Sequence, residues 1–338
     1  MNPGPDNAEL RALVCVPNWL GDSIMAMPAL CGLKRAHPDT RLTVLVKEKL
    51  GDLWRMLPEV DDQILLKDGF GGVLRAASEI RRHGYREAYV LPNSFRSALI
   101  PFLAGVPERI GRLGHRPGVL LTHIVDIETK GLHQGQEYMR MLGLDEEEVE
   151  RNGINLEVPE GVSIEHLVGE ASSDLVVGII PGAARGPSKR WPAERFMEVG
   201  QWIGDAAEGR VYVFGSSEEQ ELGEQVARGI GDHATNLAGK TSVHELICCM
   251  KQCKTVICND SGGMHLAAAA GLPVVAIFGL TDPLKTAPRG AGHRIISKED
   301  VTQQRDIERK SSAAQDVLES IEAETVIEAV ADLLHISS

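Results

Sequence analysis

The sequence from Thr255 to Pro288, TVICNDSGGMHLAAAAGLPVVAIFGLTDPLKTAP, constrains the fold of this chain more than any other stretch. Its first four residues are apolar or β-branched, as in a buried strand, and a polar glycine-rich turn, 259–263, follows them. The Ala-rich segment 264–270 then predicts a short buried helix that ends at Gly271. Residues 273–278 predict a second strand. A strand, a turn, a helix and a strand in this order are the repeating unit of a parallel α/β sheet.

The turn between this strand and this helix is suited to binding an anion. Free backbone N–H groups and the helix dipole attract phosphate at a helix N-terminus, and glycine lets the phosphate come close to the backbone. Asp260 would repel a phosphate, so it either binds a sugar hydroxyl or caps the helix. His265 is either a partly buried residue of the first helical turn or a ligand of the same site.

The composition narrows the class of protein. A length of 338 residues suggests two domains, and 43% hydrophobic residues are enough for sizeable cores. The net charge of −13 argues against a nucleic-acid partner. None of the six cysteines forms a CxxC pair, so we expect reduced, mostly buried thiols and no metal site.

The start, MNPGPDNAEL, has neither the basic end nor the apolar core of a signal peptide, and no apolar run reaches the roughly 18 residues of a membrane span. We therefore expect a cytoplasmic protein.

Alternating strand and helix patterns run through the whole chain, which predicts parallel sheets with helices on both faces. Strands are expected at 11–17, 42–46, 63–66, 87–91, 175–180, 210–214, 235–237, 255–258 and 273–278, and helices between them and at 322–334. A polar segment at 157–174 is the candidate linker. We expect an N-terminal Rossmann-like domain at 1–165, a C-terminal one at 174–320, and a final helical segment at 321–338, with packing on the N-terminal domain as one option.

Ligands of doubly wound sheets bind at the carboxyl ends of the strands. The polar loops that follow the predicted strands are 18–22, 92–96, 182–189, 215–219 and 259–263. We expect them to converge on one cleft between the two halves. Ser242 and Glu245 have the spacing of a capping box at the start of the helix 243–251.

Residues 95–123 form the one basic region of the chain. Four arginines face a single carboxylate, Glu108, which gives a balance of +3: Arg96, Arg109, Arg112 and Arg116. Apolar residues alternate with them. The region is either a solvated face beside a buried helix or a surface for an anionic, partly apolar partner, and its contrast with the acidic remainder favours the second interpretation.

Five motifs in register, from about Leu13 to about Pro288, resemble glycosyltransferase family 9, the heptosyltransferases: WLGDSIMAMPAL, YVLPNSFRSALIPFLAGVPERIG, PGAARGPSKRWP, LAGKTSVHEL and NDSGGMHLAAAAGLPVVAIFGLTDP. The NSFRSAL and GPSKRWP forms are most similar to the ADP-heptose:lipopolysaccharide heptosyltransferase II branch. The chain departs from the pattern after Lys298, where it is polar and free of cysteine, and at Leu280, where proline is common.

The resemblance implies the GT-B fold, with two Rossmann-like domains facing a central cleft. It implies a nucleotide-sugar donor, ADP-heptose, in the C-terminal domain, and a phosphorylated lipopolysaccharide inner-core acceptor on the N-terminal domain. Heptose would be transferred with inversion at its anomeric carbon. Peripheral contact with the cytoplasmic face of the inner membrane is an option.

The resemblance also implies roles for individual residues. Asp22 would be the base that deprotonates the acceptor, although its place at a strand-to-helix turn also suits a helix cap. Lys189, a point charge in a Gly/Pro/Ser loop, suits the donor diphosphate, together with the N–H groups of Ser261, Gly262 and Gly263 and with His265. Asp260 would bind the donor sugar. The remaining candidates are Glu219, Gly239, Lys240 and Thr241 for the nucleoside, and Asn93, Ser94 and the four arginines for the acceptor.

Two rival hypotheses remain, besides a family 9 transferase with another donor or acceptor. A nucleotide-sugar 2-epimerase would need further carboxylates that act on the sugar ring. A catalytically silent binder would be expected to lack Asp22 or Lys189, and both are present. No Asp-x-Asp pair ends a strand, so we expect neither a metal nor a cofactor, and the absence of G-x-G-x-x-G after the first strand argues against a dehydrogenase.

Overall fold

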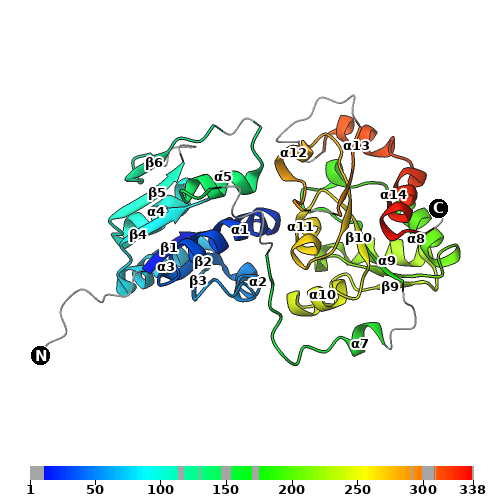
Figure 1. Ribbon diagram of the computed structural model, residues 1–338, viewed down its shortest axis with the longest axis horizontal. Helices are drawn as coiled ribbons and strands as arrows, with labels where there is room; N and C mark the ends of the chain where they lie inside the picture. Colours follow the sequence, from blue (N-terminus) through cyan, green and yellow to red (C-terminus); the bar gives the residue numbers. More distant parts are fainter. Residues whose placement is uncertain are drawn as a thin grey trace, which may run out of the picture. The chain divides into compact units, whose positions relative to one another are not determined.

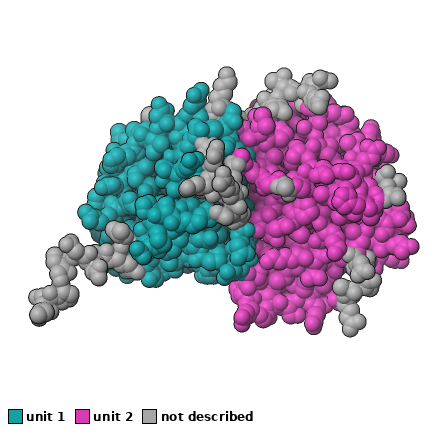
Figure 2. Space-filling model, viewed as in Figure 1, with its two compact units in different colours: residues 1–157 teal, residues 158–338 magenta. Residues whose placement is uncertain are grey.

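The computed structural model describes residues 11–112, 118–128, 131–145, 154–169, 175–290, 292–298, 308 and 310–336. The chain divides into two compact units, residues 1–157 and 158–338 (Figures 1 and 2). Each unit has its own sheet and its own hydrophobic core, so we describe the two separately.

The first unit contains a six-stranded sheet in the order β3-β2-β1-β4-β5-β6, in which every neighbouring pair is parallel. Its central strands are short and almost fully buried, as expected when helices cover both faces of a sheet. The strands are β1 (Arg11–Cys15), β2 (Arg41–Lys47), β3 (Asp62–Leu66), β4 (Glu87–Val90), β5 (Glu108–Arg112) and β6 (His123–Val125).

Two pairs of helices cover this sheet. Helix α1 (Leu20–Ala36) packs on α5 (Gln134–Met141), and α3 (Gly69–His83) packs on α4 (Phe95–Ala104). Helix α1 connects β1 to β2, and α3 connects β3 to β4, which lies in the opposite direction across the sheet. Because both connections are right-handed, the two helix pairs cover opposite faces of the sheet. The short α2 (Gly51–Arg55) adjoins β2 and β3.

The second unit repeats this arrangement. Its parallel sheet has the order β12-β11-β10-β7-β8-β9. When the strands are counted within each unit, both sheets have the order 3-2-1-4-5-6 of a dinucleotide-binding Rossmann fold. The strands are β7 (Val176–Ile180), β8 (Arg210–Val213), β9 (Ala234–Asn236), β10 (Thr255–Asn259), β11 (Val274–Ile277) and β12 (Arg294–Ile296).

The helices of the second unit also form two groups. Helices α8 (Ala193–Asp205), α9 (Gln220–Ile230) and α14 (Ala323–Leu334) share one core with the sheet. Helix α10 (Val243–Met250) packs on α11 (Gly262–Ala269), which lies on β10 and β11. The remaining α-helices of the described residues in this unit are α7 (Glu165–Val168), α12 (Pro283–Thr286) and α13 (Ser312–Glu319). The predicted fold class, α/β with two doubly wound Rossmann-like sheets, is confirmed.

The structure differs from the sequence-based expectations in three places. Three strands were not predicted: β5 lies inside the basic region, β6 begins at its last residue, and β12 lies in the second unit. The final helix does not form a separate segment, because α14 packs on α8 and on β11 and β12 within the second unit. Asp22 and Asp260 are not helix caps: the N-cap residues of α1 and α11 are Trp19 and Ser261.

Candidate functional site

Two polar segments of the second unit lie where its strand order reverses, between β7 and β10. Open α/β sheets bind ligands in the crevice outside the carboxyl ends of the strands at this reversal. The loop 181–192 follows β7, and Asp260 and Ser261 follow β10. The two segments therefore meet at the position where this fold class binds its ligand.

Asn259, the last residue of β10, holds the loop after β7 at both of its ends. Its Nδ2 donates to the Pro181 carbonyl at 2.8 Å, and its Oδ1 accepts from the Trp191 N–H at 2.9 Å. The side chain is fully buried. An amide that offers both a donor and an acceptor can satisfy a carbonyl and an N–H together. Asn259 therefore fixes the loop that carries Lys189, a role that its sequence position did not reveal.

Lys189 and Asp260 form a largely buried ion pair. Lys189 Nζ lies 2.5 Å from Asp260 Oδ2, and their side chains are 14% and 7% exposed. The ammonium is thus held at the end of β10, immediately before the start of α11. The structure brings together two residues that lie 71 positions apart, and it shows that the charge of Asp260 is compensated rather than isolated.

The N-terminus of α11 adjoins this ion pair. Ser261 is the N-cap residue, but its side chain makes no capping hydrogen bond, and its buried Oγ has no hydrogen-bond partner among the described residues. The same holds for Ser188 Oγ, next to Lys189. A Cβ at Gly263 would lie 2.9 Å from Ile180 Cδ1, so glycine lets the start of this helix lie close to the end of β7 without a shift of the Ile180 side chain. His265 is buried within the first turns.

The candidate nucleoside residues form a second group at the same edge of the sheet. Glu219 Oε2 accepts from the N–H and from the hydroxyl of Ser216, both at 2.9 Å, as a capping box does. The Gly239 N–H donates to the Gly215 carbonyl at 3.0 Å, which brings the loop with Lys240 and Thr241 beside the loop with Glu219. Gly239 has a φ of 71°, which favours glycine.

Gly182 belongs to the loop after β7 and lies against Glu219 of the nucleoside group, since a Cβ at Gly182 would collide with the Glu219 carboxylate. The loop that carries Lys189 and the turn that carries Glu219 are therefore in close contact. The predicted capping box of α10 is also confirmed: Ser242 N–H donates to Glu245 Oε2 at 2.7 Å, and Glu245 N–H donates to Ser242 Oγ at 3.3 Å.

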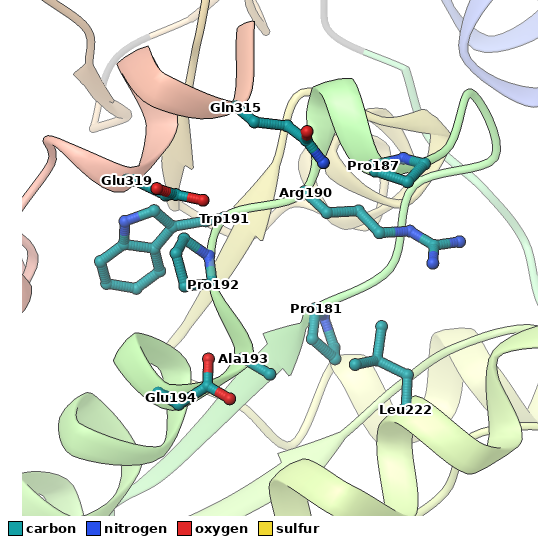
Figure 3. A pocket seen from close by; sticks show the side chains of 10 residues that line it. All are labelled: Pro181, Pro187, Arg190, Trp191, Pro192, Ala193, Glu194, Leu222, Gln315 and Glu319. Atoms are coloured by element: carbon teal, nitrogen blue, oxygen red, sulfur yellow. The ribbon is translucent and has the colours of Figure 1, made fainter. Parts of the chain in front are cut away.

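A cavity of about 350 Å³ opens beside the loop after β7, on the side of α8 and α9 (Figure 3). Arg190 and the Trp191–Glu194 segment line it together with Leu222 and two residues of α13, Gln315 and Glu319. None of the predicted donor-binding residues is among its lining residues. The Arg190 guanidinium donates to the Ala183 carbonyl at 3.2 Å, so this arginine also stabilises the loop.

In the first unit, Asp22 lies at the corresponding reversal of strand order, between β1 and β4. It occupies the first turn of α1 and is half-buried. Tyr138 of α5 is buried nearby, and burial, followed by the negative charges of Asp22 and Glu137, raises its pKa well above the usual value. Helix α5 comes close to α1, since a Cβ at Gly135 would lie 3.2 Å from the Met25 carbonyl oxygen.

Asn93 and Ser94 follow β4 at the same reversal. Ser94 is the N-cap residue of α4, and its Oγ accepts from the Ser97 N–H at 3.2 Å. Asn93 is exposed. Ser94 therefore stabilises the helix start, whatever else it binds.

The arginines of the basic region have partners inside the first unit. Arg112 Nη1 lies 2.6 Å from Glu137 Oε2, in an ion pair whose side chains are 17% and 3% exposed. Arg109 donates to the Leu120 carbonyl at 2.6 Å. Arg96 donates to the Gly69 carbonyl at 3.0 Å. Arg116 lies outside the described residues. The structure thus gives the three described arginines structural contacts that the charge pattern alone did not predict.

The described residues offer neither a metal-binding cluster nor a membrane-spanning helix. No group of three or more His, Cys, Asp or Glu side chains is placed to hold a metal ion in this part of the chain. None of the described helices has the length and apolar character that a bilayer span requires. The six cysteines are unpaired, and burial raises the pKa of Cys15 and Cys31 to about 12.

Comparison with known proteins identifies the family of this chain. The model of glycosyltransferase family 9 (heptosyltransferase) matches residues 73–315. Lipopolysaccharide heptosyltransferase 2 of Escherichia coli is 30% identical over 85% of this chain and 88% of its own length. The Salmonella typhimurium protein of the same name is 32% identical over the same shares. The solved structure of E. coli ADP-heptose lps heptosyltransferase II superposes with a TM-score of 0.81 at 27% identity, covering 96% of this chain and 99% of that one. The chain belongs to glycosyltransferase family 9, the heptosyltransferases, and its two Rossmann-like units are those of the GT-B fold.

Proposed function

We propose that this protein is an inverting heptosyltransferase of lipopolysaccharide core biosynthesis. It transfers heptose from ADP-L-glycero-β-D-manno-heptose to the inner-core heptose of lipopolysaccharide, as heptosyltransferase II does. The observation that carries this proposal is the ion pair of Lys189 and Asp260 beside the N-terminus of α11, in the unit whose sheet would bind the nucleotide sugar. The similarity to proteins named lipopolysaccharide heptosyltransferase 2 supports the choice of donor and acceptor.

The donor binds to the second unit. The diphosphate is contacted by the Lys189 ammonium, by N–H groups at Ser261, Gly262 and Gly263, and by His265. The buried hydroxyls without partners support this assignment, because such a group costs about 1–3 kcal/mol unless it finds one. Asp260 binds hydroxyls of the heptose, and its pairing with Lys189 places sugar-binding and phosphate-binding groups side by side.

The nucleoside lies over the loops that carry Glu219, Gly239, Lys240 and Thr241. The contacts among these loops support a common site, since Gly239 is bonded to the loop that begins the Glu219 turn. Both hydrogen bonds from Ser216 go to Oε2 of Glu219. The other carboxylate oxygen, Oε1, suits a ribose hydroxyl.

The acceptor binds to the first unit. Asp22 takes the proton of the acceptor hydroxyl as that oxygen attacks the anomeric carbon of heptose, and the bond from this carbon to the diphosphate breaks. ADP leaves with the bonding electrons, and Lys189 together with the α11 N-terminus stabilises its charge. These groups supply positive potential without a divalent cation, so we propose a metal-independent reaction.

Acceptor contacts come from Asn93 and Ser94 at the carboxyl end of β4 and from the arginines of the basic region. Among the described arginines, Arg112 is best placed, because it ends β5 on the same edge of the sheet. Arg116 is proposed on its sequence alone. Arg96, Arg109 and Arg112 can bind acceptor only in addition to their structural contacts. We further propose that the protein acts in the cytoplasm and meets its lipid acceptor at the inner membrane.

A panel of nucleotide sugars tests this function by thermal shift in the presence of EDTA. A ligand that binds only the folded state stabilises it, by about 2.7 kcal/mol at a concentration of 100 times its dissociation constant. ADP-heptose and ADP should raise the melting temperature, and UDP-N-acetylglucosamine should not. A shift with the UDP sugar alone would favour the 2-epimerase, and a shift that requires added Mg²⁺ would contradict metal independence.

A further inference from the structure

The large hydrophobic side chains that the described residues expose are concentrated in the first unit. Only Leu284 and Ile295 belong to the second. Four of the others lie on two neighbouring helices, with exposed fractions of 44% to 66%, and we call these four the α3–α4 face: Phe70, Leu74, Phe95 and Phe102. Single exposed apolar residues need no explanation, whereas a contiguous group marks an interaction surface.

Two arginines show that this group is contiguous. Arg96 of α4 donates to the Gly69 carbonyl at 3.0 Å, which joins the start of α4 to the start of α3. Arg81 of α3 donates to the Leu103 carbonyl at 2.5 Å, which joins the ends of the same helices. The helices therefore lie side by side and run in the same direction. Phe70 and Leu74 are one helical turn apart on α3, and Phe95 and Phe102 are two turns apart on α4, so each pair lies on one side of its helix. We infer that the two pairs share one surface.

This surface is basic although the protein is acidic. Residues 67–82 and 95–104 contain five cationic side chains against two carboxylates, Asp68 and Glu79, in a chain of net charge −13. Arg75 follows Leu74, is exposed, and makes no hydrogen bond or ion pair within the described part of the chain. The Arg109 guanidinium lies 5.4 Å from the centre of the Phe102 ring. Phenylalanines surrounded by arginines match the interface of a bilayer with anionic headgroups.

We propose that the α3–α4 face docks this enzyme on an anionic lipid bilayer. Phe70, Phe95 and Phe102 insert between the headgroups, and the surrounding arginines contact lipid phosphates. The inference rests on the proposed function in one respect, namely that the acceptor is a lipid. A second copy of the chain fits this surface less well, because a twofold contact would bring the same cations against one another.

The test is cosedimentation of the full chain with vesicles of phosphatidylethanolamine and phosphatidylglycerol, with phosphatidylcholine vesicles for comparison. The protein should bind only the anionic vesicles. Arg75→Glu reverses one exposed charge and should weaken binding on the order of 10-fold. Phe70→Ser combined with Phe102→Ser should weaken it at least as much. Leu284→Ser is the matched control, since Leu284 is 74% exposed in the second unit, and its vesicle binding should match wild type.

Melting temperatures show whether the variants fold, and transfer to a lipid-free heptose acceptor shows whether they retain the chemistry. Failure of the proposed function would abolish transfer in wild type as well, whereas failure of the docking proposal would leave transfer intact. Vesicle binding that is unchanged in both face variants, or equally weakened in Leu284→Ser, would overturn the proposal. A wild-type dimer that the double Phe variant dissociates would identify the face as a contact between copies instead.

Discussion

Asn259 has the clearest structural role of any single residue near the proposed donor site. Truncation in Asn259→Ala removes the partners of the Pro181 carbonyl and the Trp191 N–H, and each unsatisfied buried group costs about 1–3 kcal/mol. We expect the free energy of unfolding to fall by roughly 2–5 kcal/mol, and ADP affinity to fall because Lys189 is no longer held. Urea denaturation and ADP titration measure the two effects.

Asn236→Ala is the matched control for this change. Asn236 Oδ1 also accepts from a backbone N–H, that of Ala238 at 3.0 Å, but its side chain is only half-buried. A smaller loss of stability is expected. Equal losses in the two variants would show that Asn259 has no special role in holding the loop.

Asp22 is the residue on which the proposed chemistry depends. Asp22→Asn preserves size and shape but cannot accept the proton, so turnover should fall by about 10²–10⁴-fold. ADP affinity should stay unchanged, because the proposed diphosphate ligands belong to the other unit. Stability should change little: Asp22 is inside the first turn of α1, where a carboxylate contributes only about 0.3–1 kcal/mol. Near-normal turnover in Asp22→Asn would rule this residue out as the base.

At the scale of elements, the ion pair of Arg112 and Glu137 connects the end of β5 to α5. Arg112→Ala removes the cation that pairs with the nearly buried Glu137 carboxylate, so it should destabilise the protein by about 3–5 kcal/mol. The combined change Arg112→Met with Glu137→Gln should recover a large part of that loss. Chemical denaturation of the set gives the coupling energy.

The exposed pair of Arg55 and Asp52 provides the comparison, since its side chains are 57% and 56% exposed. Arg55→Ala should cost at most about 1 kcal/mol. A similarly small effect of Arg112→Ala would mean that the ion pair is not structural. A raised acceptor KM in Arg112→Ala is informative only after this stability effect has been measured.

The edge between β11 and β12 should be sensitive to pH through His293. Its Nδ1 accepts from the Val274 N–H at 3.2 Å, and burial lowers its pKa below the usual 6.5. The unfolded chain therefore binds a proton at a higher pH than the folded one. This stabilisation is complete above about pH 6.5 and is lost as the pH falls toward the folded pKa. His293→Asn keeps an acceptor and cannot titrate, so its melting temperature should fall less than that of wild type between pH 7.5 and 5.5. Parallel curves for the two proteins would contradict this assignment.

The strands that sequence patterns predicted most plainly are those with a continuous apolar run. β7, β10 and β11 are fully buried, so their composition was distinctive. β5, with the sequence ERIGR, lies toward the edge of its sheet and is mostly half-exposed, and β12 has only three residues. Neither offers such a run. The helix start at Ser242 was predictable because a capping box is a local pattern.

The site could be predicted only in part for a similar reason. The turn after β10 and the loop with Lys189 were recognisable as polar segments that follow strands. The pairing of Lys189 with Asp260, the amide contacts of Asn259 and the partners of Arg96, Arg109 and Arg112 join residues far apart in sequence. Such contacts depend on strand order, and periodicity does not specify strand order.

At the scale of the whole molecule, the two units share one strand order but differ in their surfaces. The second unit carries the ion pair and the α11 N-terminus, whereas the first carries Asp22 and the exposed α3–α4 face. This division agrees with our proposal that the second unit binds the nucleotide sugar and the first unit binds the lipopolysaccharide acceptor. This division of tasks is what a transferase between a water-soluble donor and a membrane-bound acceptor requires.

The most direct test of the account is a transfer assay with the purified protein, ADP-heptose and lipopolysaccharide that carries a single inner-core heptose, in EDTA. Mass spectrometry of the acceptor and quantification of released ADP are read together. The account predicts that the acceptor gains one heptose for each ADP released, with no added metal. An acceptor of unchanged mass, with the nucleotide sugar intact, epimerised or merely hydrolysed, would contradict it.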